Sequence, residues 1–143
     1  MQILNRKAHF EYTIEEEVEA GIMLLGSEVK SVREGKVSLA EAYVSEAGGE
    51  LFLTNCNINE YTAANRLNHA PKRPRKLLLR GKEIERIIGK INSKGYSAVP
   101  LKMYLKKRFI KVLIGIGRGK KLYDKRQSIK ERDDKRRNAR GEE

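Results

Sequence analysis

What the 143-residue chain lacks narrows the range of its functions. It has no tryptophan, one cysteine, two histidines and three prolines. Cys56 alone can form neither an internal disulfide nor a cysteine metal cluster. His9 and His69 lack a metal-ligand spacing such as HExxH, and the glycines within 117–121 lack the spacing of a Walker phosphate loop. We therefore expect no metal, no cofactor and no enzymatic activity.

Long apolar runs are also missing. The longest strongly apolar stretch is Gly21–Leu25, whereas a membrane-spanning helix needs about 20 apolar residues. The N-terminus has neither the apolar region nor the cleavage site of a signal peptide. We therefore expect a cytoplasmic protein with no membrane partner.

Basic residues are abundant and unevenly distributed. The chain has 31 Lys and Arg against 19 Asp and Glu, a formal net charge of +12. Residues 1–65 have 5 basic and 11 acidic side chains, whereas residues 66–143 have 26 and 8. Such a positive pole attracts a polyanion. Nucleic acid is favoured over an anionic membrane, because no segment combines a basic face with a broad apolar stripe.

The C-terminal segment is the most basic part. Residues 118–143 have 11 basic, 6 acidic and only four apolar side chains, too few to offset the entropy of ordering. We expect an RNA-binding barrel domain at residues 1–117 and a tail at 118–143 that is disordered when free. Glu131 and Asp133 each precede a basic residue by four positions, so the tail can become helical when bound. A merely solubilising tail is the alternative.

Hydrophobic periodicity predicts about six short strands, at residues 10–14, 21–25, 42–45, 51–58, 99–105 and 110–116. Helices are predicted from Ser27 to Gly35 and within Leu77–Ile91, and a long loop over 61–75. We expect a mainly β fold: a small closed antiparallel barrel, OB-like, with two or three short helices and a basic tail. Closure is favoured because it removes exposed sheet edges.

Two basic clusters lie within the predicted domain. Residues 72–82 include six cations, and a second set consists of Lys106, Lys107, Arg108 and Lys111. On one side of the barrel they would engage several phosphates with salt-dependent affinity, although a solvated face is the alternative. Aromatic side chains are few, which favours recognition of a folded RNA by its shape over stacking along a single strand.

Six segments, read together, carry a resemblance to a known family. They are NRKA at 5–8, EEEVEAGI at 15–22, GSEVKSVREG at 26–35, NHAPKRPRKLLL at 68–79, VPLKMYL at 99–105 and GKKLYDKR at 119–126. In this order they resemble the SmpB family, the SsrA-binding proteins. The resemblance implies an RNA-binding adaptor that binds the tRNA-like domain of transfer-messenger RNA (tmRNA) and delivers it to stalled ribosomes for trans-translation. Another ribosome-associated OB-fold RNA-binding protein of translation is the alternative.

The resemblance also implies two sets of site residues. The RNA-binding set is Asn5, Glu19, Arg75, Lys76, Leu78 and Lys111. The ribosome-binding set, in the tail, is Gly119, Lys120, Lys121, Asp124, Lys125 and Arg126. The resemblance places the tail in the decoding site and messenger channel of the small ribosomal subunit, with a monomer in the complex. Within the first set, Arg75, Lys76 and Lys111 suit phosphates, Asn5 suits sugar or base edges, and Glu19 suits a neighbouring cation or a hydroxyl.

Overall fold

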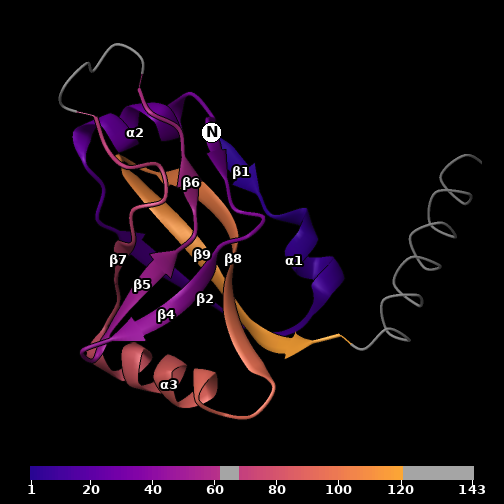
Figure 1. The fold of residues 1–143 in the computed structure, drawn as a ribbon. Helices are drawn as coiled ribbons and strands as arrows, with labels where there is room; N and C mark the ends of the chain where they lie inside the picture. Colours follow the sequence, from indigo (N-terminus) through magenta and orange to yellow (C-terminus); the bar gives the residue numbers. More distant parts are fainter. Residues whose placement is uncertain (62–67, 121–143) are drawn as a thin grey trace, which may run out of the picture.

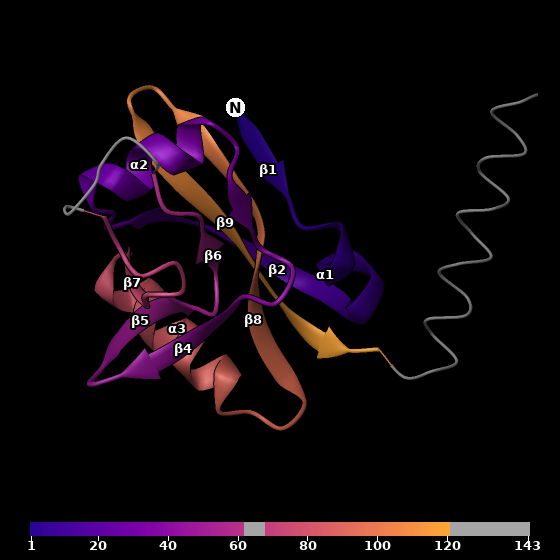
Figure 2. The ribbon, with the colours of Figure 1, turned by 45° about the horizontal axis from the view of Figure 1, so that its top comes forward.

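The computed structural model describes residues 1–61 and 68–120. The elements follow in the order β1 (Gln2–Leu4), α1 (Arg6–Glu11), β2 (Tyr12–Ile22), α2 (Gly26–Arg33), β3 (Val37–Ser38), β4 (Tyr43–Ala47), β5 (Glu50–Thr54), β6 (Asn57–Ile58), β7 (Arg75–Leu78), α3 (Gly81–Ile91), β8 (Tyr96–Lys106) and β9 (Phe109–Gly119). Figures 1 and 2 show α2 and α3 at opposite ends of the curled sheet.

One antiparallel sheet of seven strands, in the order β1-β8-β9-β2-β7-β5-β4, carries the fold. Its centre consists of β8, β9 and β2, each of 11 residues. Strands β8 and β9 form a hairpin whose tight turn places Lys106 opposite Phe109. A separate pair, β3 and β6, completes the mainly β architecture.

Alternating side chains of the central strands fill the core. The inward-facing residues are fully or almost fully buried: Val18, Val44, Leu51, Leu53, Leu77, Met103, Val112, Ile114 and Ile116. Ile87 of α3 and Val32 of α2 close the two ends of this core. A smaller cluster of Ala8, Val99 and Leu101 lies on the other face of the sheet, where α1 covers it. Within residues 1–61 and 68–120, no helix covers the part of that outer face beyond α1.

The prediction of a closed barrel was wrong. β4 lies against β8, but the two strands are not hydrogen-bonded neighbours, so the sheet curls without closing. The amide Nδ2 of Asn5 donates to the carbonyls of Pro100 and Leu39, at 2.7 and 3.1 Å. The side chain thus occupies one carbonyl of β8, next to the residues of β8 that pair with β1.

Two local predictions were also wrong. The strand predicted at residues 10–14 begins only at Tyr12, because Asn5 caps the helix α1 over residues 6–11 through Oδ1 and the N–H of Ala8. Arg75–Leu78 forms strand β7 where a loop and then a helix were predicted. Pairing with β2 and β5 decides the conformation of this segment, and α3 begins only at Gly81.

The end of β9 marks the limit of the described domain. The strand continues to Gly119, opposite Tyr12, and the N–H of Lys120 donates to the carbonyl of Glu11 at 2.8 Å. The remainder of the predicted tail, from residue 121, lies outside the described residues. Within the described residues, no helix has the length and apolar character needed to cross a membrane.

Candidate nucleic-acid interface

The open part of the outer sheet face is organised by a row of four residues from four strands. Tyr104 of β8 pairs with Lys111 of β9, Lys111 pairs with Gly21 of β2, and Gly21 pairs with Leu78 of β7. Directly opposed residues in a sheet share a face, so these four lie side by side. The sheet thus brings two of the predicted RNA-binding residues, Leu78 and Lys111, to either side of one glycine.

Glu19 lies on the same face, two residues before Gly21. Its carboxylate accepts a hydrogen bond from the hydroxyl of Tyr104 and two from Nζ of Lys106, at 3.2 and 3.4 Å. The hydrogen bond from Tyr104 and then that from Lys106 lower the pKa of Glu19, so the carboxylate stays charged. Burial, followed by the hydrogen bond to Glu19, raises the pKa of Tyr104 to about 12. Glu19 therefore fixes one aromatic hydroxyl and one ammonium group in place.

A shallow hollow of about 210 Å³ begins beside this row. Leu78 and Phe109 line it as exposed apolar side chains, 49% and 68% accessible, and Arg108 and Lys111 contribute cations. The ammonium of Lys111 lies 6.0 Å from the centre of the Phe109 ring. Gly21 contributes to the lining without a side chain of its own. The hollow thus combines apolar walls with positive charge.

Lys76 belongs to the neighbouring part of the same face. It precedes Leu78 by two residues on β7, and its side chain is partly exposed. Its ammonium makes an ion pair of 2.9 Å with Glu50, whose side chain is 47% exposed. An exposed pair of this kind contributes little to stability, so Lys76 can exchange its partner for a phosphate at small cost.

Arg75 does not fit the predicted phosphate role. Its side chain is completely buried, Nε donates to Glu28 at 2.5 Å, and Nη1 donates to the Cys56 carbonyl at 2.6 Å. Burial raises the pKa of Glu28, but hydrogen bonds from Arg73, the Leu25 N–H and Arg75 outweigh it and hold that pKa below its ordinary value. Arg75 therefore joins β7 to α2 and to the end of β5 from inside the protein.

Asn5 does not fit a direct RNA contact either. Only 4% of it is accessible. Its amide Nδ2 donates to the carbonyls of Pro100 and Leu39, and Oδ1 accepts from the N–H of Ala8. With these contacts the side chain caps α1 and fastens it to β8, which is a structural task.

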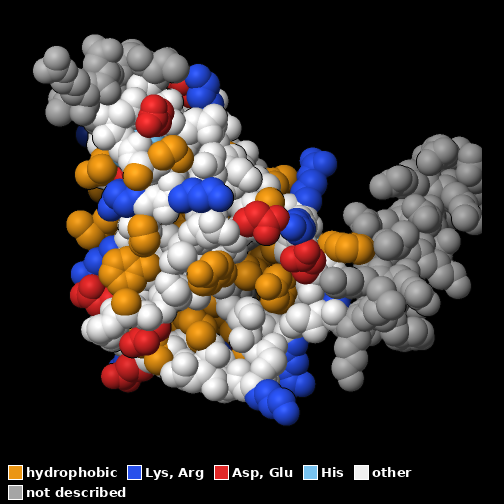
Figure 3. All heavy atoms as spheres, viewed as in Figure 1, with side chains coloured by type: hydrophobic (Ala, Val, Ile, Leu, Met, Phe, Trp, Pro, Cys, Tyr) orange, Lys and Arg blue, Asp and Glu red, His pale blue; other side chains and the backbone are white. Residues whose placement is uncertain are grey.

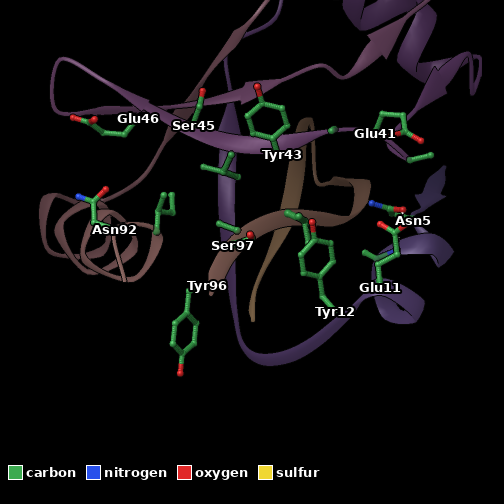
Figure 4. A pocket seen from close by; sticks show the side chains of 17 residues that line it. Asn5, Glu11, Tyr12, Glu41, Tyr43, Ser45, Glu46, Asn92, Tyr96 and Ser97 are labelled. Atoms are coloured by element: carbon green, nitrogen blue, oxygen red, sulfur yellow. Dashed lines mark hydrogen bonds between the residues drawn. The ribbon is translucent and has the colours of Figure 1, made fainter. Parts of the chain in front are cut away.

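A second hollow, of about 470 Å³, lies on a different side, where β4 diverges from β8 (Figure 4). Figure 3 shows apolar side chains at the middle of this face, with acidic side chains to either side. Tyr12 points into it, Tyr43 lines it from β4, and the carboxylates among its lining residues are Glu11, Glu41 and Glu46. Lys7 pairs with two of these carboxylates, 2.5 Å from Glu41 and 3.7 Å from Glu11. No Lys or Arg is among the described residues that line the hollow, so it is the poorer place for a nucleic acid.

The tail residues are only partly described. Gly119 ends β9, and Nζ of Lys120 donates to the carbonyl of His9 at 3.0 Å, beside α1. Lys121, Asp124, Lys125 and Arg126 lie outside the described residues. Lys111 and Lys120 are nine residues apart on an extended strand, which corresponds to about 30 Å. Lys120, the last described residue, therefore lies far from the row of Lys111, Gly21 and Leu78.

Comparison with known proteins decides the family. A family model described as "SmpB protein" matches residues 2–142. The chain belongs to the SmpB family. An SsrA-binding protein of Rickettsia canadensis is 60% identical over 130 residues, covering 90% of this chain and 86% of that protein. The SsrA-binding protein of Rickettsia prowazekii is 58% identical over 132 residues, covering 92% and 87%.

Family membership extends to the three-dimensional structure. A chain of the solved structure named "tmRNA-SmpB: a journey to the center of the bacterial ribosome" superposes with a TM-score of 0.72 at 44% identity. The match covers 85% of each chain. The mainly β fold with its few helices is thus shared with a chain of that structure.

Sequence reasoning missed Tyr104 and Phe109 as members of this face. Tyr104 was visible only as one residue in an alternating strand, and its contact with Glu19 depends on the register of β8, β9 and β2. Phe109 follows a basic run and could have been noticed as an apolar residue at a predicted hairpin turn. In residues 1–61 and 68–120, no three His, Cys, Asp or Glu side chains are grouped to hold a metal.

Proposed function

We propose that this protein is an RNA-binding adaptor, not an enzyme, that binds the tRNA-like domain of tmRNA and delivers it to stalled ribosomes for trans-translation. Two observations support the RNA partner: its relatives are named SsrA-binding proteins, and the matching structure is named for tmRNA and the bacterial ribosome. The observation that carries the site is the row of Lys111, Gly21 and Leu78 beside the fixed Glu19.

The chemistry of the face suits a folded RNA. Lys76, Lys106 and Lys111 supply ammonium groups for phosphates, and each released counterion adds to the salt dependence of binding. Glu19 has two roles in this proposal: it positions Lys106, and its remaining lone pairs accept from a ribose or base hydrogen-bond donor. Leu78 supplies apolar contact to an exposed base or sugar. Recognition therefore combines charge with a shaped apolar surface.

The sheet domain and the tail would bind different partners. The curled sheet of residues 1–117, a variant of the oligonucleotide-binding fold, would carry the tmRNA, and residues 118–143 would contact the decoding site and messenger channel. The exit of the chain beside α1, about 30 Å along β9 from Lys111, allows the two RNA partners to be bound at separate places. The protein would act as a monomer in the cytoplasm.

The test is the salt dependence of binding to the tRNA-like domain of tmRNA. Lys111→Gln should weaken binding and reduce the slope of log K against log salt concentration by about one. Lys94→Gln is the matched control, because Lys94 is an exposed lysine in the turn between α3 and β8. An unchanged slope for Lys111→Gln, or an equal affinity for unstructured RNA, would overturn the proposal.

A further inference from the structure

The hollow lined by Leu78 and Phe109 has exposed apolar side chains, which binding of phosphate to the neighbouring cations does not require. Phe109 has the largest accessible fraction, 68%, among the exposed large apolar side chains of the described residues. Single exposed apolar residues are common on protein surfaces and need no function. Here, however, Phe109 and the half-exposed Leu78 belong to one hollow of about 210 Å³, with Arg108 and Lys111 in its lining.

The position of Phe109 is fixed by the hairpin. It is the first residue of β9 and pairs with Lys106, so only Lys107 and Arg108 form the turn. Lys107 adopts the left-handed conformation, with φ of 58°, which closes this tight connection. The ring therefore projects from a well-defined strand end.

Gly21 lines the hollow beside Leu78 without adding a side chain. A Cβ built on Gly21 would lie 3.2 Å from Cβ of Leu78, closer than ordinary van der Waals contact. The absence of a side chain therefore lets Leu78 lie over β2 at the edge of the hollow. Ile22, Leu24, Val29 and Ile110 also line the hollow. An aromatic ring beside an otherwise aliphatic lining suits a planar, apolar-faced group.

The cations indicate what that planar group is attached to. Lys111 lies within cation–π distance of the Phe109 ring, and Arg108 lines the same hollow. No carboxylate is among the residues lining it. A nucleotide combines a flat ring with a neighbouring negative charge. Its base can stack on an aromatic side chain while its phosphate contacts the cations.

We propose that this hollow holds one unstacked nucleobase of the bound RNA, with Phe109 stacked on its face and Arg108 and Lys111 at its phosphate. The inference rests on the proposed RNA-binding function and adds a base-stacking subsite to it. Phe109 is thus a binding residue that supplies stacking, whereas Lys111 supplies charge.

The absence of tryptophan from the chain allows a direct test. Phe109→Trp introduces a single indole into the hollow, and a stacked base quenches its fluorescence. Tyr43→Trp is the control, since Tyr43 is 46% exposed but lies in the acidic hollow beside β4. Titration with the tRNA-like domain of tmRNA should quench the indole at 109 strongly and leave the indole at 43 nearly unchanged.

A second variant separates stacking from charge. Phe109→Leu keeps an apolar side chain but removes the ring, and it should weaken binding about ten-fold with an unchanged salt slope. If the RNA binds with full affinity to Phe109→Leu and the indole at 109 is not quenched, the subsite is refuted while the RNA-binding function stands. If the RNA fails to bind the unaltered protein, the proposed function itself is refuted.

Discussion

Tyr104 of β8 donates a hydrogen bond to Glu19 of β2 across the intervening strand β9. The same carboxylate accepts from Lys106, so one acidic residue organises an aromatic hydroxyl and an ammonium on the open sheet face. This contact gives Glu19 a role in a basic surface: it fixes the positions of groups that would otherwise be mobile.

Removing the Tyr104 hydroxyl should loosen this arrangement. Tyr104→Phe should raise the pKa of Glu19 toward its ordinary value, because the hydrogen bond from Tyr104 is the main cause of the lowered pKa. RNA affinity should fall about two- to ten-fold, the effect expected from one hydrogen bond. NMR titration of the Glu19 side-chain carboxyl measures the first effect, and a filter-binding titration measures the second. An unaltered Glu19 titration would show that the contact is not formed in solution.

Arg75 should prove to be a stability residue. Arg75→Met leaves Glu28 buried without one of its partners, so the free energy of unfolding should fall by about 3–5 kcal/mol. Urea denaturation measures this loss. RNA affinity per folded molecule should remain close to that of the unaltered protein. A variant as stable as its parent that fails to bind RNA would restore Arg75 to the interface.

The lowered pKa of the buried Glu28 carboxyl also makes the stability of the protein depend on pH. Its pKa in the folded protein lies below the ordinary 4.5, so its contribution is complete above pH 4.5 and is lost as the pH falls through the folded value. Glu28→Gln should therefore reduce stability at neutral pH and flatten the loss of stability in acid. Denaturation midpoints of both proteins, measured from about pH 3 to about pH 7, test this expected loss of stability in acid. Parallel acid profiles for both proteins would contradict it.

Gly21→Ala tests the packing beneath Leu78. The new methyl group meets Leu78 Cβ at 3.2 Å, so Leu78 must shift by a few tenths of an ångström. We expect a loss of about 1 kcal/mol in stability and weaker RNA binding. Gly81→Ala is the control, because a Cβ there meets nothing within 4 Å. Equal RNA affinities for the two alanine variants would show that Leu78 does not contact the RNA.

The two-part division of the chain predicts separable losses. Replacing Asp124, Lys125 and Arg126 together with alanine should leave binding of isolated tmRNA nearly unchanged and abolish peptide tagging on stalled ribosomes. Both activities are measured with the same preparation, by RNA binding and by a reconstituted tagging reaction. Equal loss of both would mean that the tail and the sheet do not bind different partners.

The sequence predicted much of the scaffold and less of the site. Alternation located β8, β9 and their hairpin, since residues 101–104 and 109–114 alternate between buried and more accessible side chains. It could not supply the registers that bring Gly21 between Leu78 and Lys111, because register depends on pairing between distant strands. The burial of Arg75 was equally invisible, since its carboxylate partner Glu28 comes from a helix far earlier in the sequence.

Two of the errors in the fold involve Asn5. Asn5 was read only as an RNA contact, but it caps α1 and binds the Pro100 carbonyl of β8. The cap makes the first two residues of the alternating stretch helical, and the bond to Pro100 takes one carbonyl of β8 beside the residues that pair with β1. A polar residue with three buried partners cannot be recognised from its neighbours in the sequence.

The central claim is that RNA binds the open sheet face and not the acidic hollow. The most direct measurement is the change in backbone amide NMR signals when the tRNA-like domain of tmRNA is added to the full chain. The largest changes should occur at Glu19, Gly21, Leu78, Phe109 and Lys111, while the signals of Tyr43 and Ser97 stay in place. Changes confined to Tyr43, Ser97 and their neighbours would contradict the account.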